Sequence, residues 1–272
     1  MKKLASAGVT VMILSTLAYA DTPEERGKAI LDAQIAAVKK WSDSGPMTAT
    51  FAKGAFVLLP TGEESASDGG IAAAIAFLDP HATLKDASYD HLTAAGNASV
   101  SWFTADLHFT VTSSGSTEKH TVRTIELLDG AAGWKVAVAA FTNVDKLAPN
   151  GSCNITHATD PGPLVNLLVA PASLAAALDA KAVVLGTDPG ERGSGPDAKK
   201  LVDGWKKLQL TLDTAQKARE VHTPTYGYGM TNVKLAPSKA GGHAMAMSAF
   251  VLALPGANGT WSVVAASYGA TF

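Results

Sequence analysis

The chain has 272 residues, of which 47% are hydrophobic and 17% are charged. Because disordered chains combine low hydrophobicity with high net charge, this composition excludes disorder over most of the length. The formal net charge of −2 provides no strongly basic surface for nucleic acid, and the single cysteine excludes a disulfide framework or a cysteine-rich zinc site.

Residues 1–20 are predicted to be a secretory signal peptide. Lys2 and Lys3 form a basic start, residues 9–17 are mainly apolar, and Ala18 and Ala20 supply the small residues of a cleavage site. The apolar stretch is too short to span a bilayer comfortably. Cleavage after Ala20 leaves 20 basic and 24 acidic residues, a net charge of −4, since both early lysines are lost. We expect a periplasmic or secreted protein with no stable membrane insertion.

The first domain is predicted at residues 21–147 and opens with a helix. Thr22 suits the N-cap and Pro23 the first helical position, and Gly45 and Pro46 are expected to stop the helix. The elements predicted after it are a strand at 55–59, a helix at 69–78, and strands at 82–85, 98–113, 119–128 and 134–141.

A linker at residues 148–161, rich in Pro, Gly and Asn, precedes a second domain at 162–272. This domain is predicted to follow the same plan. Its elements are a helix at 164–178 interrupted by Pro171, a strand at 183–185, a helix at 197–208, and strands at 209–213, 225–235, 243–254 and 261–268.

An internal repeat relates the two halves at a separation of 127 residues. The residues that recur are Val57 and Val184, Leu58 and Leu185, Glu64 and Glu191, and Ser67 and Ser194. The segment that begins at Trp134 parallels the one that begins at Trp261 at the same separation, and each follows a glycine-containing turn. Two matching blocks in one order indicate duplication of a domain of roughly 115 residues.

Helices followed by long antiparallel strands indicate an α+β fold. Each half resembles the SnoaL-like branch of the nuclear transport factor 2 superfamily, which includes ketosteroid isomerase and scytalone dehydratase. The residues that carry the resemblance are 183–192, Trp205, 226–233 and 261–264, while the first half departs from it at Pro60, Thr61 and Gly62. The resemblance implies two tandem cones, each with helices packed in the concave face of a curved antiparallel sheet.

The same resemblance directs attention to carboxylates, because ketosteroid isomerase uses an aspartate base inside an apolar cavity. Asp106 is the low-ranked catalytic candidate, and Asn232 is its counterpart in the second half. Strand alternation, however, turns Phe103 toward the helices and Asp106 toward the opposite face. We therefore interpret Asp106 as a ligand-binding or interface residue, together with Trp102, Tyr226, Tyr228 and Asn232.

No cofactor, metal or nucleotide site is predicted. No histidine pair has the spacing of a zinc-binding helix, and His108 and His120, which could face each other across a hairpin, are interpreted as solvated strand residues. The glycine-rich stretch 186–195 has more acids than bases, which disfavours phosphate. Cys153, in the linker, is interpreted as a free thiol.

Three functions stay open. The first is a non-catalytic module that binds a small apolar ligand or a protein. The second is an isomerase- or dehydratase-type enzyme that uses an aspartate or histidine as general acid-base, and the third is a structural envelope protein. A nucleic-acid partner is not expected. The two domains are expected to pack as an intramolecular pseudo-dimer.

Overall fold

The computed structural model describes residues 22–38, 45–59, 62–65, 83–113, 115–144, 155, 157–213, 217–236 and 244–270. These residues form two compact units. Unit 1 consists of the described residues up to Ala55, within Ser65–Lys119 and within Glu126–Val138. Unit 2 consists of the described residues within Phe56–Glu64, within His120–Ile125 and from Ala139 onward. The predicted signal peptide, the predicted helix at 69–78 and Cys153 lie outside the described residues.

Unit 1 begins with helix α2 (Pro23–Val38), whose start is fixed by a capping box. The Glu25 amide donates to Thr22 Oγ1 at 3.2 Å, and the Thr22 amide donates to Glu25 Oε2 at 3.0 Å. The N-cap prediction for Thr22 is therefore confirmed. A short helix, α3 (Gly45–Thr48), starts where the sequence predicted only a stop.

The sheet of unit 1 is built from long antiparallel strands. They are β3 (Thr83–Gly96), β4 (Val100–Ser113), β5 (Ser116–Asp129) and β6 (Lys135–Asn143). In the sheet, each of these strands lies next to the one that precedes it in the chain. Strand β1 (Phe51–Leu59) pairs with β6 and with β2 (Gly62–Ser65). Strand β3 continues through residues 86–96, which the sequence analysis did not assign to a strand. Strands β1, β5 and β6 each contribute residues to both units.

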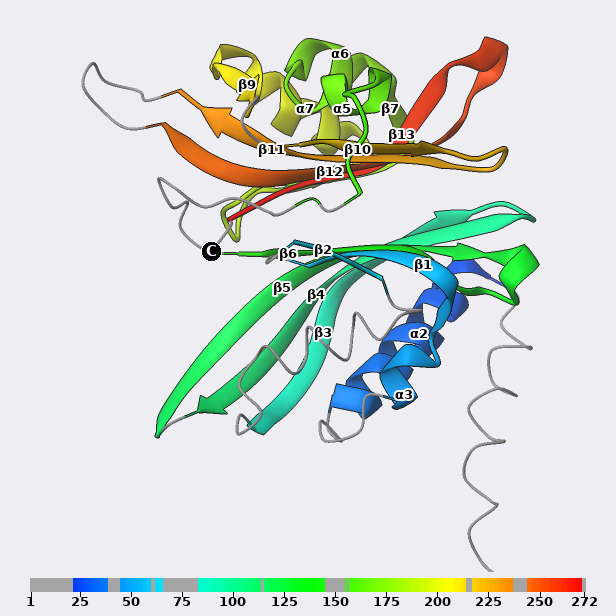
Figure 1. Cartoon of the computed structure of the whole chain (residues 1–272), viewed down its shortest axis with the longest axis vertical. Helices are drawn as coiled ribbons and strands as arrows, with labels where there is room; N and C mark the ends of the chain where they lie inside the picture. Colours follow the sequence, from blue (N-terminus) through cyan, green and yellow to red (C-terminus); the bar gives the residue numbers. More distant parts are fainter. Residues whose placement is uncertain are drawn as a thin grey trace, which may run out of the picture. The chain divides into compact units, whose positions relative to one another are not determined.

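One face of the β3–β4 pair packs on α2, which lies along these strands in Figure 1. A Cβ added to Gly27 would come within 3.2 Å of the Phe103 ring, and the Tyr89 hydroxyl donates to Asp32 Oδ1 at 3.0 Å. Since successive strand residues point to opposite faces, Asp106 points away from the helix, as the alternation predicted.

Unit 2 packs short helices on one face of a second group of strands (Figure 1). The helices are α5 (Pro163–Leu167), α6 (Pro171–Ala177) and α7 (Pro196–Gly204), each with proline at the start. The strands are β7 (Leu178–Leu185), β8 (Arg192–Ser194), β9 (Leu210–Leu212), β10 (Arg219–His222), β11 (Gly227–Leu235), β12 (Met245–Pro255) and β13 (Trp261–Ala270).

The strands run in the order β10-β11-β12-β13, all antiparallel, and β7 lies parallel to β13. Leu164, Leu168 and Val202 from the helices and Val251 and Val263 from the strands are among the fully buried core residues. Tyr268 reaches into this core, where its hydroxyl donates to Leu168 O at 2.9 Å. The core of unit 2 is thus occupied by its own side chains.

Equivalent elements recur at the offset of 127 residues. A 3-10 turn, η1 (Gly130–Ala132), precedes β6, and another, η3 (Ala257–Gly259), precedes β13. Trp134 and Trp261 follow these turns and are both half-buried. The described residues form a mixed α+β fold with fewer helices than the proposed plan, and two complete tandem cones stay a prediction. No helix in the described part of the chain is long and apolar enough to cross a membrane.

Candidate functional site

An open groove of about 690 Å³ lies in unit 2. Its lining residues combine four small or aliphatic side chains with hydroxyls and charges: Ala158, Thr159, Asp160, Pro161, Leu212, Asp213, Lys217, Ala218 and Thr231. Thr231 and Asp213 are buried, whereas Asp160 and Lys217 are exposed. The groove therefore has a closed floor and a charged rim.

The groove forms where strand β11 changes partners. Residues 227–230 of β11 pair with β10, and residues 233–235 pair with β9, so Thr231 lies between the two pairings. The Asp213 amide donates to Asn232 O at 2.9 Å, and the Thr159 amide donates to Ala218 O at 2.8 Å. These two bonds fix the segments on either side of the opening.

Thr231 faces the helix side of the sheet. It alternates with Gly229, where an added Cβ would meet Val165 at 3.1 Å, and with Val233, which belongs to the helix-side core. The groove therefore opens on the face that carries α5–α7.

The groove offers charged, hydroxyl and apolar groups side by side. Asp213 Oδ1 lies 2.8 Å from Lys234 Nζ, so its carboxylate is neutralised by an ion pair. Asp160 and Lys217 add an exposed carboxylate and an exposed ammonium group at the rim. The Thr231 hydroxyl, which donates to Asn232 O at 3.4 Å and can still accept a hydrogen bond, and the small apolar side chains are contacts for a ligand.

Three of the five predicted site residues belong to unit 2. Tyr228 is 4% exposed and stacks on Phe56 with ring centroids 4.7 Å apart. Asn232 is 1% exposed and lies on the same face of β11 as Tyr228, opposite to the face of Thr231. Tyr226 closes a turn, since the Thr223 hydroxyl donates to its carbonyl oxygen at 2.8 Å. None of the three lines the groove.

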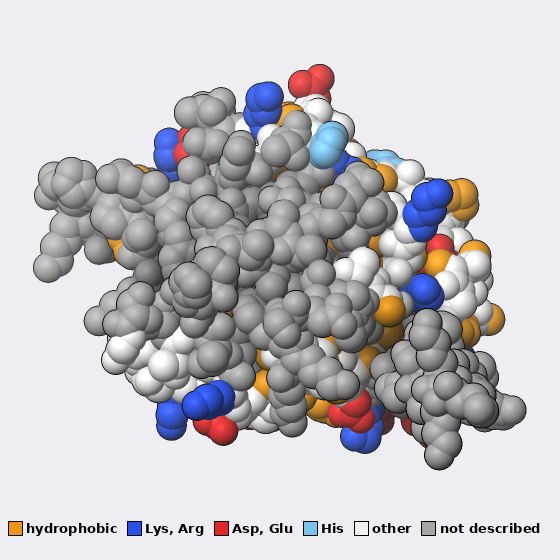
Figure 2. Space-filling view, turned by 60° about the horizontal axis from the view of Figure 1, so that its bottom comes forward, with side chains coloured by type: hydrophobic (Ala, Val, Ile, Leu, Met, Phe, Trp, Pro, Cys, Tyr) orange, Lys and Arg blue, Asp and Glu red, His pale blue; other side chains and the backbone are white. Residues whose placement is uncertain are grey.

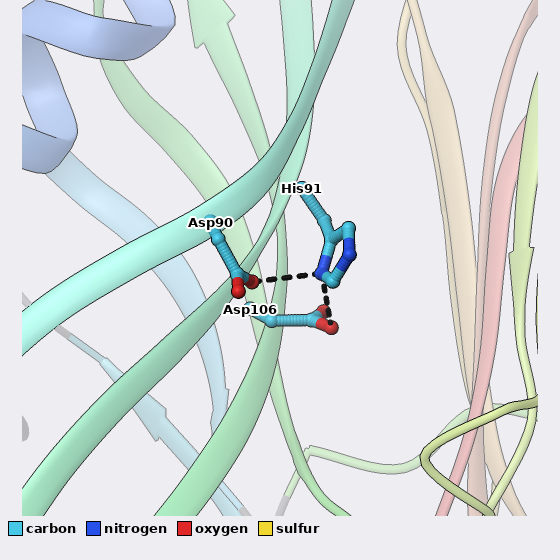
Figure 3. A group of neighbouring side chains, drawn as sticks. All are labelled: Asp90, His91 and Asp106. Carbon is cyan, nitrogen blue, oxygen red and sulfur yellow. Dashed lines mark ion pairs between the residues drawn. The ribbon is translucent and has the colours of Figure 1, made fainter.

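The other two predicted residues, Trp102 and Asp106, lie on β4 in unit 1. Trp102 is 1% exposed, and the Asp106 side chain is 8% exposed. His91 Nδ1 lies 3.3 Å from Asp106 Oδ2, and His108 Nε2 lies 3.1 Å from Asp90 Oδ1 (Figure 3 draws the first pair). The sequence analysis named neither Asp90 nor His91 as a site residue, because both fall in the part of β3 that it did not recognise.

A buried carboxylate also lies on the helix side of unit 1. Glu126 is fully buried, and its Oε2 accepts a hydrogen bond from Gln34 Nε2 at 2.9 Å. The corresponding interior of unit 2 holds Tyr268, edge-on to Trp205 at 5.1 Å, and burial raises the pKa of its hydroxyl.

On the face drawn in Figure 2, the described surface carries Lys and Arg beside Asp and Glu, with apolar side chains in small separate areas. Leu208, at 41% exposure, is the exposed large hydrophobic residue among the described ones. This surface carries no broad apolar patch among the residues that the figure colours.

No protein-family model matches the chain. No curated protein matches it either. Among solved structures, it is similar to a ketosteroid isomerase-like protein from Erwinia carotovora atroseptica, with 15% identity, 44% of this chain and 94% of that chain covered, and a TM-score of 0.38.

Two further solved structures are similar over a comparable part. One is a nuclear transport factor 2-like superfamily protein from Salmonella enterica, at 15% identity, with 46% of this chain and 94% of that chain covered and a TM-score of 0.37. The other is an NTF2-like protein from Cytophaga hutchinsonii, at 11% identity, 42% and 92% coverage, and a TM-score of 0.35. The neighbours thus come from the superfamily that the sequence resembles, and no residue role is taken from them.

Proposed function

We propose that the chain is a non-catalytic binding module whose ligand is a small, mostly apolar molecule with one hydrogen-bonding group. The observation that carries the proposal is the groove of unit 2, in which four apolar side chains lie among hydroxyls and charges and the buried Thr231 forms part of the floor. Its volume of about 690 Å³ lies within the range of small-molecule sites.

Two features support binding without catalysis. The buried carboxylate of the groove, Asp213, is paired with Lys234 and is not available as a base. The buried carboxylate of unit 1, Glu126, accepts a hydrogen bond from the Gln34 amide at 2.9 Å. An isomerase or dehydratase needs its acid-base group beside the substrate, and Glu126 is not among the residues that line the groove.

The affinity follows from the open shape of the groove. Closed pockets bury most of a drug-sized ligand, whereas an open groove leaves one side of it in water. We therefore expect a dissociation constant on the order of 10–100 μM, about −5.5 to −7 kcal/mol.

The test is a titration of ¹⁵N-labelled mature protein with a set of small aromatic and aliphatic compounds, followed by amide NMR shifts. Binding should shift the amides of Thr159, Ala218 and Thr231 together. The exposed Ala158→Trp substitution fills the groove and should remove these shifts. Ala176→Trp, at an exposed alanine of α6, is the matched control and should leave them unchanged. Shifts that survive Ala158→Trp, or that cluster elsewhere, would refute the proposal.

We further propose that this module works outside the cytoplasm, in the periplasm or secreted, after cleavage behind Ala20. Its support is the basic start at Lys2 and Lys3 and the small residues Ala18 and Ala20. Mass spectrometry of protein recovered from the cell envelope should give a mature chain that begins at Asp21. An exported chain that retains Met1 would contradict this.

A further inference from the structure

Strand β3 departs from regular geometry at two points. Its register against β4 shifts between Lys85 and Ser88 and again between Asp90 and Thr93, so β3 has an extra residue at each point. Each extra stretch contains a non-glycine residue with positive φ, Asp86 at 55° and His91 at 51°. Such bulges bend a strand and re-aim its side chains.

The second bulge has a chemical consequence. In a regular strand, the adjacent residues Asp90 and His91 would point to opposite faces. Here His91 Nδ1 lies 2.7 Å from Asp90 Oδ1 and 3.3 Å from Asp106 Oδ2 (Figure 3). The bulge therefore turns two consecutive polar side chains toward a third residue on the neighbouring strand.

A fourth group joins from β4. His108 Nε2 lies 3.1 Å from Asp90 Oδ1, so two carboxylates and two imidazoles gather on the face of the sheet away from α2. One nitrogen or oxygen atom from each of Asp90, His91 and Asp106 lies within 4.8 Å of the others. Burial would raise the pKa of Asp90, but its hydrogen bond and charge interaction with His108, and the charge interaction with His91, outweigh burial and lower it.

These atoms are held at hydrogen-bonding distances, slightly shorter than the edges of a coordination shell. A regular tetrahedron with metal–ligand bonds of about 2.1 Å has edges of about 3.4 Å. The atom pairs of this cluster, at 2.7, 3.1 and 3.3 Å, need only small side-chain rotations to reach that spacing. The Asp106 side chain is 8% exposed and those of Asp90 and His91 are 53% and 60% exposed, so the cluster has an anchored side and an open side.

We propose that Asp90, His91 and Asp106, with His108 beside them, form a binding site for a divalent transition-metal cation of the Zn²⁺ type. Mixed imidazole and carboxylate ligands suit borderline cations, whereas Mg²⁺ and Ca²⁺ favour shells made of oxygen alone. Two carboxylates this close repel each other, and a dication between them removes that repulsion. All four residues belong to unit 1, and the proposal runs against the expectation of no metal drawn from the sequence.

The alternative is an ion-pair network that holds the edge of the sheet. That role requires His91 Nδ1 to carry a proton and to donate a hydrogen bond to the carboxylates, whereas a metal takes the place of this proton. The two roles differ in what removal of the imidazole does. Because His91 adopts a conformation that favours glycine, His91→Gly relieves backbone strain while it deletes the ligand.

The experiment is calorimetric titration of the untagged full mature chain, freed of metal, with ZnCl₂ at neutral pH. We expect one site with a dissociation constant below about 10 μM, at least 10-fold weaker binding of Mg²⁺ and Ca²⁺, and proton release seen as a dependence of the heat on the buffer. His91→Gly should weaken Zn²⁺ binding at least 10-fold without lowering Tm in the absence of metal.

Matched controls lie at the other bulge. Asp86→Gly relieves the same kind of strain five residues away and should leave Zn²⁺ affinity unchanged. Asp90→Asn should weaken binding at least 10-fold, whereas Asp86→Asn, which removes one charge from the same strand, should not. Absence of stoichiometric Zn²⁺ binding, equal affinity in His91→Gly and wild type, or equal losses at Asp86 and Asp90 would each overturn the proposal.

Discussion

Arg123 on β5 is the side chain whose removal should destabilise unit 2 most clearly. It is 1% exposed, and its guanidinium donates to Gly186 O at 2.6 Å, to Pro189 O at 2.7 Å and to Glu191 O at 3.3 Å. These carbonyls belong to the turn between β7 and β8. The guanidinium fork therefore holds a loop that is 63 residues or more away in the sequence.

The cost of Arg123→Met can be worked out bond by bond. Gly186 is buried, so its carbonyl loses a charge-assisted bond and gains no water, which costs about 2–3 kcal/mol. Pro189 is exposed and its carbonyl can be hydrated, so that bond is worth about 1 kcal/mol. The longer contact to Glu191 O adds about 0.5 kcal/mol. The total is about 4 kcal/mol, which corresponds to a fall in Tm of about 8–16 °C for a domain of this size.

The assay is thermal and urea unfolding of the mature chain, followed by tryptophan fluorescence. Arg219→Met is the matched control, because Arg219 is half-buried and its bonds to Tyr228 Oη and His157 O are longer, at 3.3 and 3.5 Å. The control should lose about 1 kcal/mol. A loss below about 1 kcal/mol for Arg123→Met, or one equal to that of the control, would refute the bond-by-bond reasoning.

Two further predictions concern buried polar groups. Gln34→Leu removes the amide that donates to the fully buried Glu126 and should cost about 2–3 kcal/mol in urea unfolding. Glu126→Gln should cost less, because the side-chain carbonyl of the new amide can still accept the hydrogen bond from Gln34 Nε2; the reverse order would contradict this. Tyr268→Phe should cost about 1 kcal/mol at neutral pH, since it removes the bond to Leu168 O. Burial raises the pKa of Tyr268 in the folded state, so its contribution is complete below the unfolded pKa of about 10 and is lost as the pH rises beyond it. Wild type should therefore lose stability between neutral and strongly alkaline pH by more than Tyr268→Phe, and equal losses would show that this hydroxyl does not resist ionisation.

The regular strands were predictable because alternation decides which face a residue takes. The sequence of β4 placed Phe103 toward the helix and Asp106 on the other face, and the contact between Phe103 and Gly27 agrees with this. The helix start at Thr22 followed from capping chemistry, which acts between near neighbours.

The cluster on β3 could not be predicted in the same way. Asp86, Asp90 and His91 are poor strand formers. The two bulges also interrupt the alternation of apolar and polar residues from which a strand is predicted. Alternation would also have assigned Asp90 and His91 to opposite faces. Arg123 escaped notice for a related reason, since a charged residue in a strand is ordinarily taken to face solvent.

The composition of unit 2 has a consequence for the order in which the protein folds. Strand β13 lies between β12 and β7 and also bridges to β6, while residues 56–64 and 120–125 belong to the same unit. Contacts between segments so distant in the sequence form slowly, because large loops must close first. The unit cannot assemble on the ribosome before residues 261–270 have emerged. If the chain is exported as proposed, this delay would keep the nascent protein able to cross the membrane until synthesis of β13 is finished.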